Sequence, residues 1–181
     1  MSKGATVWLT GLSGAGKTTI AHELRASAEA RGRQVEILDG DIVRENLSKG
    51  LGFSKEDRDT NIRRIAFVSQ LLTRNGAFVI VAAISPYAGV REEAREMIGD
   101  FVEVHVDCSI DVLTARDTKG LYEKALSGEI KNFTGISDPY EAPTSPELII
   151  STADEQVEQS AARVMDYLEA NGYLNKPVPV A

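Results

Sequence analysis

The feature that most constrains the fold is the segment GLSGAGKT at residues 11–18, which matches the G-x-x-x-x-G-K-[ST] pattern of a phosphate-binding loop (P-loop). An apolar, β-prone run at residues 5–10 precedes it, and a helical pattern containing Ile20 and Leu24 follows it. The pattern is specific in this strand–loop–helix context. The alternative, an ordinary glycine-rich turn, does not explain the whole pattern. The segment therefore predicts an α/β fold with a nucleoside triphosphate site.

The residue types of this loop suit a triphosphate bound with Mg²⁺. Its glycines let successive backbone N–H groups point inward as a nest for phosphate oxygens, and the following helix adds its positive end. Lys17 would reach the β- and γ-phosphates, and the Thr18 hydroxyl would bind Mg²⁺. The residues expected to contact ATP are Gly11, Leu12, Ser13, Gly14, Ala15, Gly16, Lys17, Thr18, Thr19 and Arg116.

Size and composition narrow the class of protein. The chain has 181 residues, of which 43% are hydrophobic and 26% charged, so we expect one globular domain over residues 1–181. The net charge of −7 argues against a nucleic-acid partner. No apolar run approaches the roughly 20 residues of a membrane span, so no membrane association is expected. The single Cys108 cannot form an internal disulfide, which favours a cytoplasmic location.

Strand and helix patterns alternate along the chain. The expected strands are residues 5–10, 34–39, 78–84, 101–107 and 148–151. The expected helices are residues 17–31, residues 55–74 with Ser54 as N-cap, and a last helix that begins at Thr152 with Glu155 completing a capping box. This alternation predicts a doubly wound, five-stranded parallel sheet of the P-loop type with flanking helices. Ligands should bind beyond the carboxyl ends of its strands.

Polar residues stand at the ends of two further predicted strands. Asp39 and Asp41 flank a glycine after the second strand, whereas Ser85 after the third strand has no acidic neighbour. P-loop proteins commonly hold Mg²⁺ through an acid at a neighbouring strand end, so Asp39 and Asp41 are the candidates for that role. A simple turn at this position is the alternative.

A long polar segment precedes the last strand. Residues 119–146 include several prolines, and their second half has weak apolar periodicity. A loop of this length in a compact domain is usually a lid or is disordered. Phe133 is expected to be an exposed aromatic that stacks on a base and orders the lid when a nucleotide binds. The tail after Tyr173 is expected to be loosely held.

Several short motifs occur along the chain in the order that is typical of one kinase family. They are GLSGAGKTT, LDGD with Arg44, LGF with DRDTNIRRIA, ISPY, RDTKGLY, and GEIKNFTGI with PYEAP. With them the chain resembles the adenylylsulfate kinase (APS kinase) family over nearly its whole length. The resemblance implies phosphorylation of adenosine 5′-phosphosulfate (APS) by ATP at the 3′-hydroxyl, giving 3′-phosphoadenosine 5′-phosphosulfate (PAPS) and ADP in sulfate activation.

The resemblance also implies roles for individual residues. The residues implied for binding APS are Asp41, Arg44, Phe53, Arg58, Asn61, Ile84, Ser85, Lys119, Asn132 and Phe133. The residues implied in catalysis are Lys17, Asp39, Asp41, Ser85 and Lys119, with Thr18 and Asp39 at the metal. Arg44 and Arg58 could fork onto phosphosulfate oxygens, and Phe53 and Phe133 could sandwich the adenine. Asp39 and Asp41 remain alternatives for the base and for the metal ligand.

Ser85 carries two alternative roles. Its family equivalent has been considered a phosphorylated intermediate, but it could equally hydrogen-bond the substrate. His22 and His105 fall on helix and strand patterns, so no activating base is evident beside Ser85. Direct in-line transfer is therefore the favoured mechanism.

The chain departs from the usual family pattern at Glu123, Leu126 and Ser137, which places the affinity and closure of the lid in question. The competing functions are a kinase for another small alcohol or nucleotide, a regulatory nucleotide-binding switch, and a non-catalytic sulfate-nucleotide module. A guanine-specific switch would need an N-K-x-D type motif, which residues 101–119 lack. The oligomeric state stays open; a homodimer is one candidate, since dimers are the commonest closed assembly.

Overall fold

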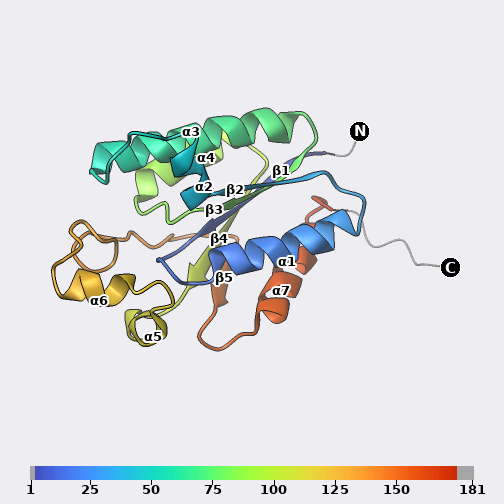
Figure 1. Cartoon of the computed structure of the whole chain (residues 1–181). Helices are drawn as coiled ribbons and strands as arrows, with labels where there is room; N and C mark the ends of the chain where they lie inside the picture. Colours follow the sequence, from blue (N-terminus) through green and yellow to red (C-terminus); the bar gives the residue numbers. More distant parts are fainter. Residues whose placement is uncertain (1–2, 175–181) are drawn as a thin grey trace.

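The computed structural model describes residues 3–174, which form a five-stranded sheet covered by helices on both faces (Figure 1). The strands are β1 (Ala5–Thr10), β2 (Val35–Asp39), β3 (Phe78–Ala82), β4 (Phe101–Asp107) and β5 (Leu148–Ser151). They lie in the order β2-β3-β1-β4-β5, and every neighbouring pair is parallel. The predicted strands and the parallel sheet are confirmed, with β2 beginning at Val35 and β3 ending at Ala82.

The helices alternate with the strands. They are α1 (Lys17–Glu29), α2 (Gly40–Glu45), α3 (Lys55–Arg74), α4 (Ala88–Ile98), α5 (Ile110–Arg116), α6 (Leu121–Leu126) and α7 (Val157–Ala170). In Figure 1, α1 and α7 cover one face of the sheet and α3 and α4 the other. This arrangement confirms the doubly wound α/β fold.

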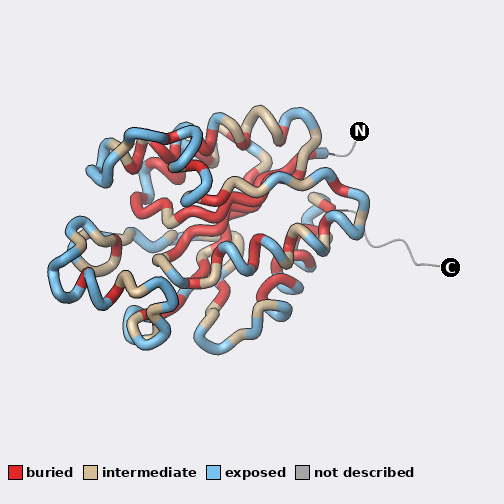
Figure 2. Tube along the Cα trace, viewed as in Figure 1, coloured by how far each residue is buried: buried red, intermediate tan, exposed pale blue. Residues whose placement is uncertain are grey.

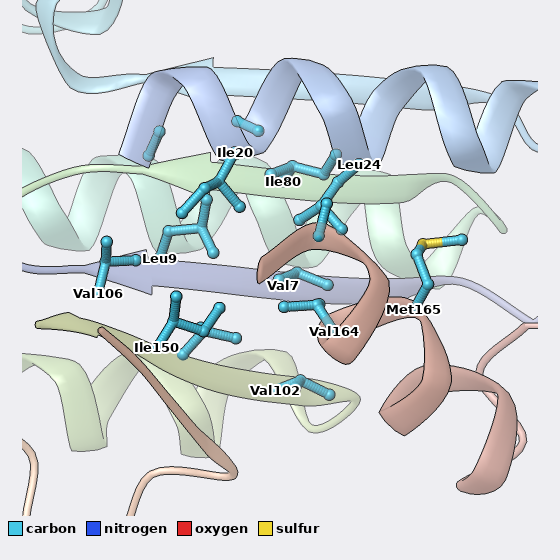
Figure 3. Packing of buried hydrophobic residues seen from close by; sticks show 14 of the residues in the cluster. Val7, Leu9, Ile20, Leu24, Ile80, Val102, Val106, Ile150, Val164 and Met165 are labelled. Carbon is cyan, nitrogen blue, oxygen red and sulfur yellow. The ribbon is translucent and has the colours of Figure 1, made fainter. Parts of the chain in front are cut away.

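The core lies on both sides of β1 and β3, whose residues are all buried (Figure 2). Successive strand residues point to opposite faces. The side chains that meet under α1 and α7 include Val7, Leu9, Ile20, Leu24 and Val164 (Figure 3). Those that meet under α3 and α4 include Trp8, Val79, Val81, Ile62 and Ile65. Burial on both faces explains why these strands are continuous apolar runs.

The helix ends agree with the sequence in one case and differ in another. Ser54 caps α3 as predicted, since its side chain accepts the N–H of Asp57 at 3.1 Å. The predicted start of the last helix at Thr152 is wrong, because α7 begins at Val157. The Thr152 hydroxyl instead donates to the Ala15 carbonyl at 2.9 Å, which holds this residue against the P-loop.

The structure bears differently on the predictions for the C-terminal tail and for membrane spans. Residues 175–181, most of the tail expected to be loosely held, lie outside them. Within residues 3–174, every helix is too short or too polar to cross a bilayer.

Replacing Ser54 with Ala should lower the free energy of unfolding by about 0.5–2 kcal/mol, because the cap of α3 is lost. Ser54→Asp keeps an acceptor and should stay near the wild-type value. Urea denaturation of the three proteins measures the difference. Equal stability of Ser54→Ala and wild type would show that the cap contributes nothing.

Candidate active site

A cavity of about 1080 Å³ opens at the carboxyl ends of the strands. Its walls come from the P-loop, from the segments that follow β2, β3 and β5, and from the polar segment before β5. This is the edge of the sheet at which the sequence places the ligand site. Almost all of the predicted site residues line this one cavity.

The glycines of the P-loop adopt conformations that other residues avoid. Gly11, Gly14 and Gly16 have φ angles of 155°, 76° and 98°. A Cβ atom on Gly11 would lie 2.3 Å from the Val106 carbonyl oxygen, so a side chain there would collide with β4. The loop is thereby held close to the sheet, and Gly16 leads directly into α1.

Lys17 is buried within this loop and bonds to it. Its Nζ donates to the carbonyl oxygens of Gly11 at 2.9 Å and Leu12 at 2.7 Å. Burial lowers the pKa of Lys17 to about 8, and the nearby ammonium of Lys119 acts in the same direction. Gly11 and Leu12 do not themselves line the cavity; they contribute these carbonyls.

Thr18 and Asp39 meet at the base of the phosphate loop. The Thr18 hydroxyl donates to Asp39 Oδ2 at 2.7 Å, and Asp39 Oδ1 accepts the N–H of Asp41 at 2.9 Å. Asp39 is 8% exposed. Hydroxyl and carboxylate oxygens are the ligands that Mg²⁺ prefers, so this pair fits the predicted metal role. Within residues 3–174, no group of three or more His, Cys, Asp or Glu side chains could hold another metal ion.

Asp41 lies in a different setting from Asp39. Its side chain is 79% exposed, and its Oδ2 accepts a hydrogen bond from Lys119 Nζ at 2.9 Å. Lys119 comes from the loop before α6, so this ion pair crosses the mouth of the cavity. The two aspartates that the sequence could not separate therefore differ in burial and in partner.

The part of the cavity wall that follows β2 combines a cation, an aromatic ring and an amide. The Arg44 guanidinium lies 4.6 Å from the centre of the Phe53 ring, and its Nη1 donates to the Gly52 carbonyl at 3.0 Å. Asn61 is 5% exposed and lines the cavity. Its Oδ1 has no hydrogen-bond partner in the described part of the chain, so it is available to a ligand.

Most of the hydrogen bonds of Arg58 go to the polar segment 119–146. Its Nε donates to the Phe53 carbonyl at 2.9 Å, and its other nitrogens donate to the Thr134 hydroxyl and the Asn132 carbonyl. The carboxylate of Asp138 accepts a further bond at 3.3 Å. Arg58 lines the cavity but anchors this segment with most of its N–H groups, a role the sequence did not indicate.

Ser85 is a wall residue with a buried hydroxyl. It is 1% exposed, its Oγ accepts the indole N–H of Trp8 at 3.0 Å, and the hydroxyl donates to the Ala83 carbonyl at 3.3 Å. His105 instead stacks on Tyr140, and burial lowers its pKa. Among the described residues, no imidazole or carboxylate hydrogen-bonds to the Ser85 hydroxyl.

The expectation that Phe133 is exposed is wrong. Its ring is partly buried and packs against the main core cluster, edge-on to Tyr122 with ring centres 5.1 Å apart. The segment 119–146 is also less irregular than predicted, since it begins with α6. Phe133 still lines the cavity, on the wall contributed by this segment.

The remaining predicted site residues line the cavity, whereas three other residues that the sequence analysis singled out do not. Those that line the cavity are Ser13, Gly14, Ala15, Gly16, Thr19, Ile84, Arg116 and Asn132. The three departures from the family pattern, Glu123, Leu126 and Ser137, do not line it. Ser137 Oγ accepts the N–H of Phe133 at 2.8 Å, so this residue shapes the turn beneath the ring.

The sequence did not indicate two residues that lie outside the P-loop and hydrogen-bond to its backbone. The Tyr122 hydroxyl donates to the Ser13 carbonyl at 2.7 Å, and Thr152 donates to the Ala15 carbonyl. Burial raises the pKa of Tyr122 to about 12. Tyr122 lies in the RDTKGLY motif, which is the signal that could identify it, whereas the pattern at Thr152 predicts the start of a helix.

Nucleotide binding should take up a proton at pH 9, because the polyphosphate stabilises the charged ammonium of Lys17, whose pKa in the free protein is about 8. The uptake should be close to one proton at pH 9 and much smaller at pH 7. Calorimetric titrations with ADP in buffers of different ionisation enthalpy measure it. Lys17→Met is the control and should abolish the uptake; wild-type uptake that is the same at both pH values would contradict the assignment.

Comparison with known proteins agrees with this geometry. The family described as adenylylsulphate kinase matches residues 3–151. The adenylyl-sulfate kinase of Rippkaea orientalis is 60% identical over 98% of both chains. That of Picosynechococcus sp. is 62% identical over 95% of this chain and 97% of its own.

A solved structure gives the same result. The Mycobacterium tuberculosis APS kinase CysC, in complex with AMPPNP and APS, has a TM-score of 0.90 and is 42% identical. The match covers 93% of this chain and 99% of that one. The P-loop fold, the cavity at the carboxyl edge and these relatives lead to one conclusion: the chain belongs to the adenylylsulphate kinase family.

Proposed function

We propose that this protein transfers the γ-phosphoryl group of ATP to the 3′-hydroxyl of APS, yielding PAPS and ADP. The observation that carries the proposal is that one cavity joins two kinds of wall. One wall is the P-loop with Lys17; the other combines Arg44, Phe53 and Asn61, which suit an anionic nucleotide.

The transfer is a direct in-line displacement. The 3′-oxygen of APS attacks the γ-phosphorus, the bond from that phosphorus to the β–γ bridging oxygen breaks, and ADP leaves with that oxygen. Asp41 orients the 3′-hydroxyl and accepts its proton. Lys17 and Lys119 neutralise the charge on the transferring group, since positioning and electrostatics supply most of the catalysis in this chemistry.

Asp39 serves the metal rather than the acceptor. It is buried beside Thr18, whereas Asp41 is exposed at the mouth of the cavity. Thr18 and Asp39 would hold Mg²⁺. When bound, the ion supplies positive charge to the oxygens of the β- and γ-phosphates.

The proposal also covers the domain organisation, location and assembly of the enzyme. Residues 1–181 act as one catalytic domain in the cytoplasm, with a lid at about residues 119–146, and nucleic acid is not a partner. A homodimer is the assembly to test, by sedimentation of the protein with and without both nucleotides.

The decisive experiment is a coupled ADP-release assay with APS against adenosine, AMP and small sugar alcohols as acceptors. APS should be preferred by a wide margin, and PAPS should form in equal amount to ADP. Preference for another acceptor would replace the proposed substrate while leaving the kinase class intact. ADP release that is independent of every acceptor would contradict phosphoryl transfer itself.

Asp41→Asn should lower kcat far more than it raises the KM for APS, because its carboxylate acts as the 3′-hydroxyl loses its proton. Steady-state kinetics with each substrate varied separate the two parameters. Glu45→Gln, an exposed acid on the same helix but outside the cavity wall, is the matched control and should behave as wild type. A changed KM with normal kcat would reduce Asp41 to a binding contact.

Ser85→Ala should retain measurable turnover, because its hydroxyl is buried and bonded to Trp8 rather than to a base. The variant should lose about 1–3 kcal/mol of stability, since the indole N–H is left without its acceptor. Wild-type enzyme incubated with γ-labelled ATP alone should carry no acid-stable phosphoserine. Labelled Ser85, together with an inactive variant, would establish the covalent route instead.

A further inference from the structure

The turn after β3 is held in an unusual backbone conformation. Ser85 has φ 50°, a left-handed value that residues with a side chain rarely adopt. Such a conformation persists only where the surrounding structure enforces it. Ile84, Ser85 and Pro86 all line the cavity, so the conformation of this turn sets the shape of one wall.

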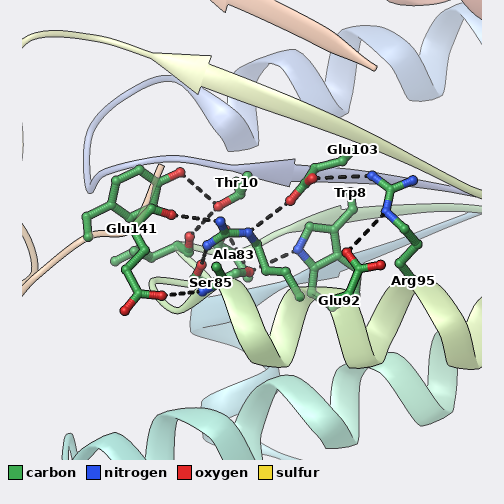
Figure 4. A network of polar contacts seen from close by, with 12 residues as sticks. Trp8, Thr10, Ala83, Ser85, Glu92, Arg95, Glu103 and Glu141 are labelled. Atoms are coloured by element: carbon green, nitrogen blue, oxygen red, sulfur yellow. Dashed lines mark hydrogen bonds and ion pairs between the residues drawn. The ribbon is translucent and has the colours of Figure 1, made fainter. Parts of the chain in front are cut away.

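A buried arginine on α4 contacts this turn and two other segments at once. Arg91 is 3% exposed; its Nη1 donates to the Ser85 carbonyl at 2.7 Å and its Nη2 to the Glu141 carbonyl at 2.7 Å. Its Nε donates to Glu103 Oε1 on β4 at 2.9 Å, which balances the buried charge. Figure 4 shows Ser85, Glu103 and Glu141 gathered in this one network.

The same network ties the end of the polar segment to the start of α4. The Glu141 N–H donates to the Pro86 carbonyl at 2.8 Å, and the Ala88 N–H donates to Glu141 Oε2 at 2.6 Å. Glu141 therefore bonds to residues on both sides of Tyr87. Arg91 links the same two segments a second time, because it bonds to both the Ser85 and the Glu141 carbonyls. Displacing one segment would displace the other.

Two further polar groups of the turn, the Ile84 carbonyl and the Ser85 hydroxyl, are also hydrogen-bonded. The Thr10 hydroxyl donates to the Ile84 carbonyl at 2.7 Å, and the Trp8 indole donates to Ser85 Oγ at 3.0 Å. Among residues 3–174, no acceptor bonds to the Ser85 N–H. The Ile84 N–H has no acceptor among these residues either, so the turn keeps two backbone donors available while its carbonyl oxygens and the Ser85 hydroxyl are hydrogen-bonded.

We propose that Arg91 is a positioning residue for the acceptor nucleotide: it holds the left-handed Ser85 turn in its binding conformation and couples that turn to the lid end at Glu141. This inference rests on the proposed function. Arg91 does not line the cavity, so it acts through the turn and not by touching substrate.

Arg91→Lys and Arg95→Lys form a matched pair for the test. Arg95 lies on the same helix and also bonds Glu103, at 3.3 Å, but its other partners are Glu147 and Glu92 and it does not contact the turn. A lysine at 91 retains the charge beside Glu103 but cannot reach all three segments. Arg91→Lys should raise the KM for APS by about tenfold or more and leave the KM for ATP within about twofold. Arg95→Lys should leave both parameters near wild type.

The chain has a single tryptophan, Trp8, which reports on the turn through its bond to Ser85. APS should change its fluorescence in wild type and in Arg95→Lys, and should do so in Arg91→Lys only at higher concentration. Glu141→Ala, at an exposed side chain, removes the bond to Ala88 and should raise the KM for APS in the same direction. It provides the test if Arg91→Lys does not fold.

The outcomes separate this inference from the proposed function. If wild type phosphorylates APS and both Arg91→Lys and Glu141→Ala keep its KM, Arg91 is only structural and the inference is wrong. Equal increases in both KM values for Arg91→Lys would also overturn it. If wild type does not phosphorylate APS, the proposed function fails before the variants are compared.

Discussion

The structure depends on the common direction of its five strands. Because every pair is parallel, all carboxyl ends meet at one edge of the sheet, and the loops that follow them come from distant parts of the chain. The order β2-β3-β1-β4-β5 puts the P-loop after the central strand, with the Asp39 and Ser85 segments beyond it on one side. A catalytic site can therefore be assembled from short segments whose spacing is set by hydrogen bonds within the sheet. The buried apolar faces make that spacing rigid.

Two buried arginines attach the polar segment to this rigid base. Arg58 on α3 holds its middle at Asn132, Thr134 and Asp138, and Arg91 on α4 holds its end at Glu141. Both helices lie on the same face of the sheet, so the segment is fixed to one layer of the protein (Figure 1). The donors of a planar guanidinium sit on three nitrogens and can bond to separate chain segments at once, whereas the three donors of a lysine share a single nitrogen.

The sequence predicted the strands, the P-loop and the α3 cap, and most of the residues that the family resemblance implied for the site line the cavity. The strands, the P-loop and the cap are the features that local patterns encode. Those patterns are apolar runs, glycine spacing and capping residues such as Ser54. It did not predict that Arg58 anchors the polar segment, that Thr152 supports the P-loop, or that Phe133 packs on Tyr122. The first two contacts join residues far apart in the chain, and the third joins a loop residue to a preceding helix. No local pattern encodes the partner in any of the three. The distinction between Asp39 and Asp41 likewise required burial, which residue type alone does not supply.

The internal bonds of Lys17 have an entropic consequence. An ammonium group has three donors, and here two of them bond to carbonyls of the loop that will enclose the phosphates. A long, flexible side chain and a glycine-rich loop are thus immobilised by one another during folding, so this conformational entropy is not lost again when the nucleotide arrives. The free energy needed to bury the charge and order the loop therefore lowers the stability of the folded protein. It does not lower the affinity for the nucleotide.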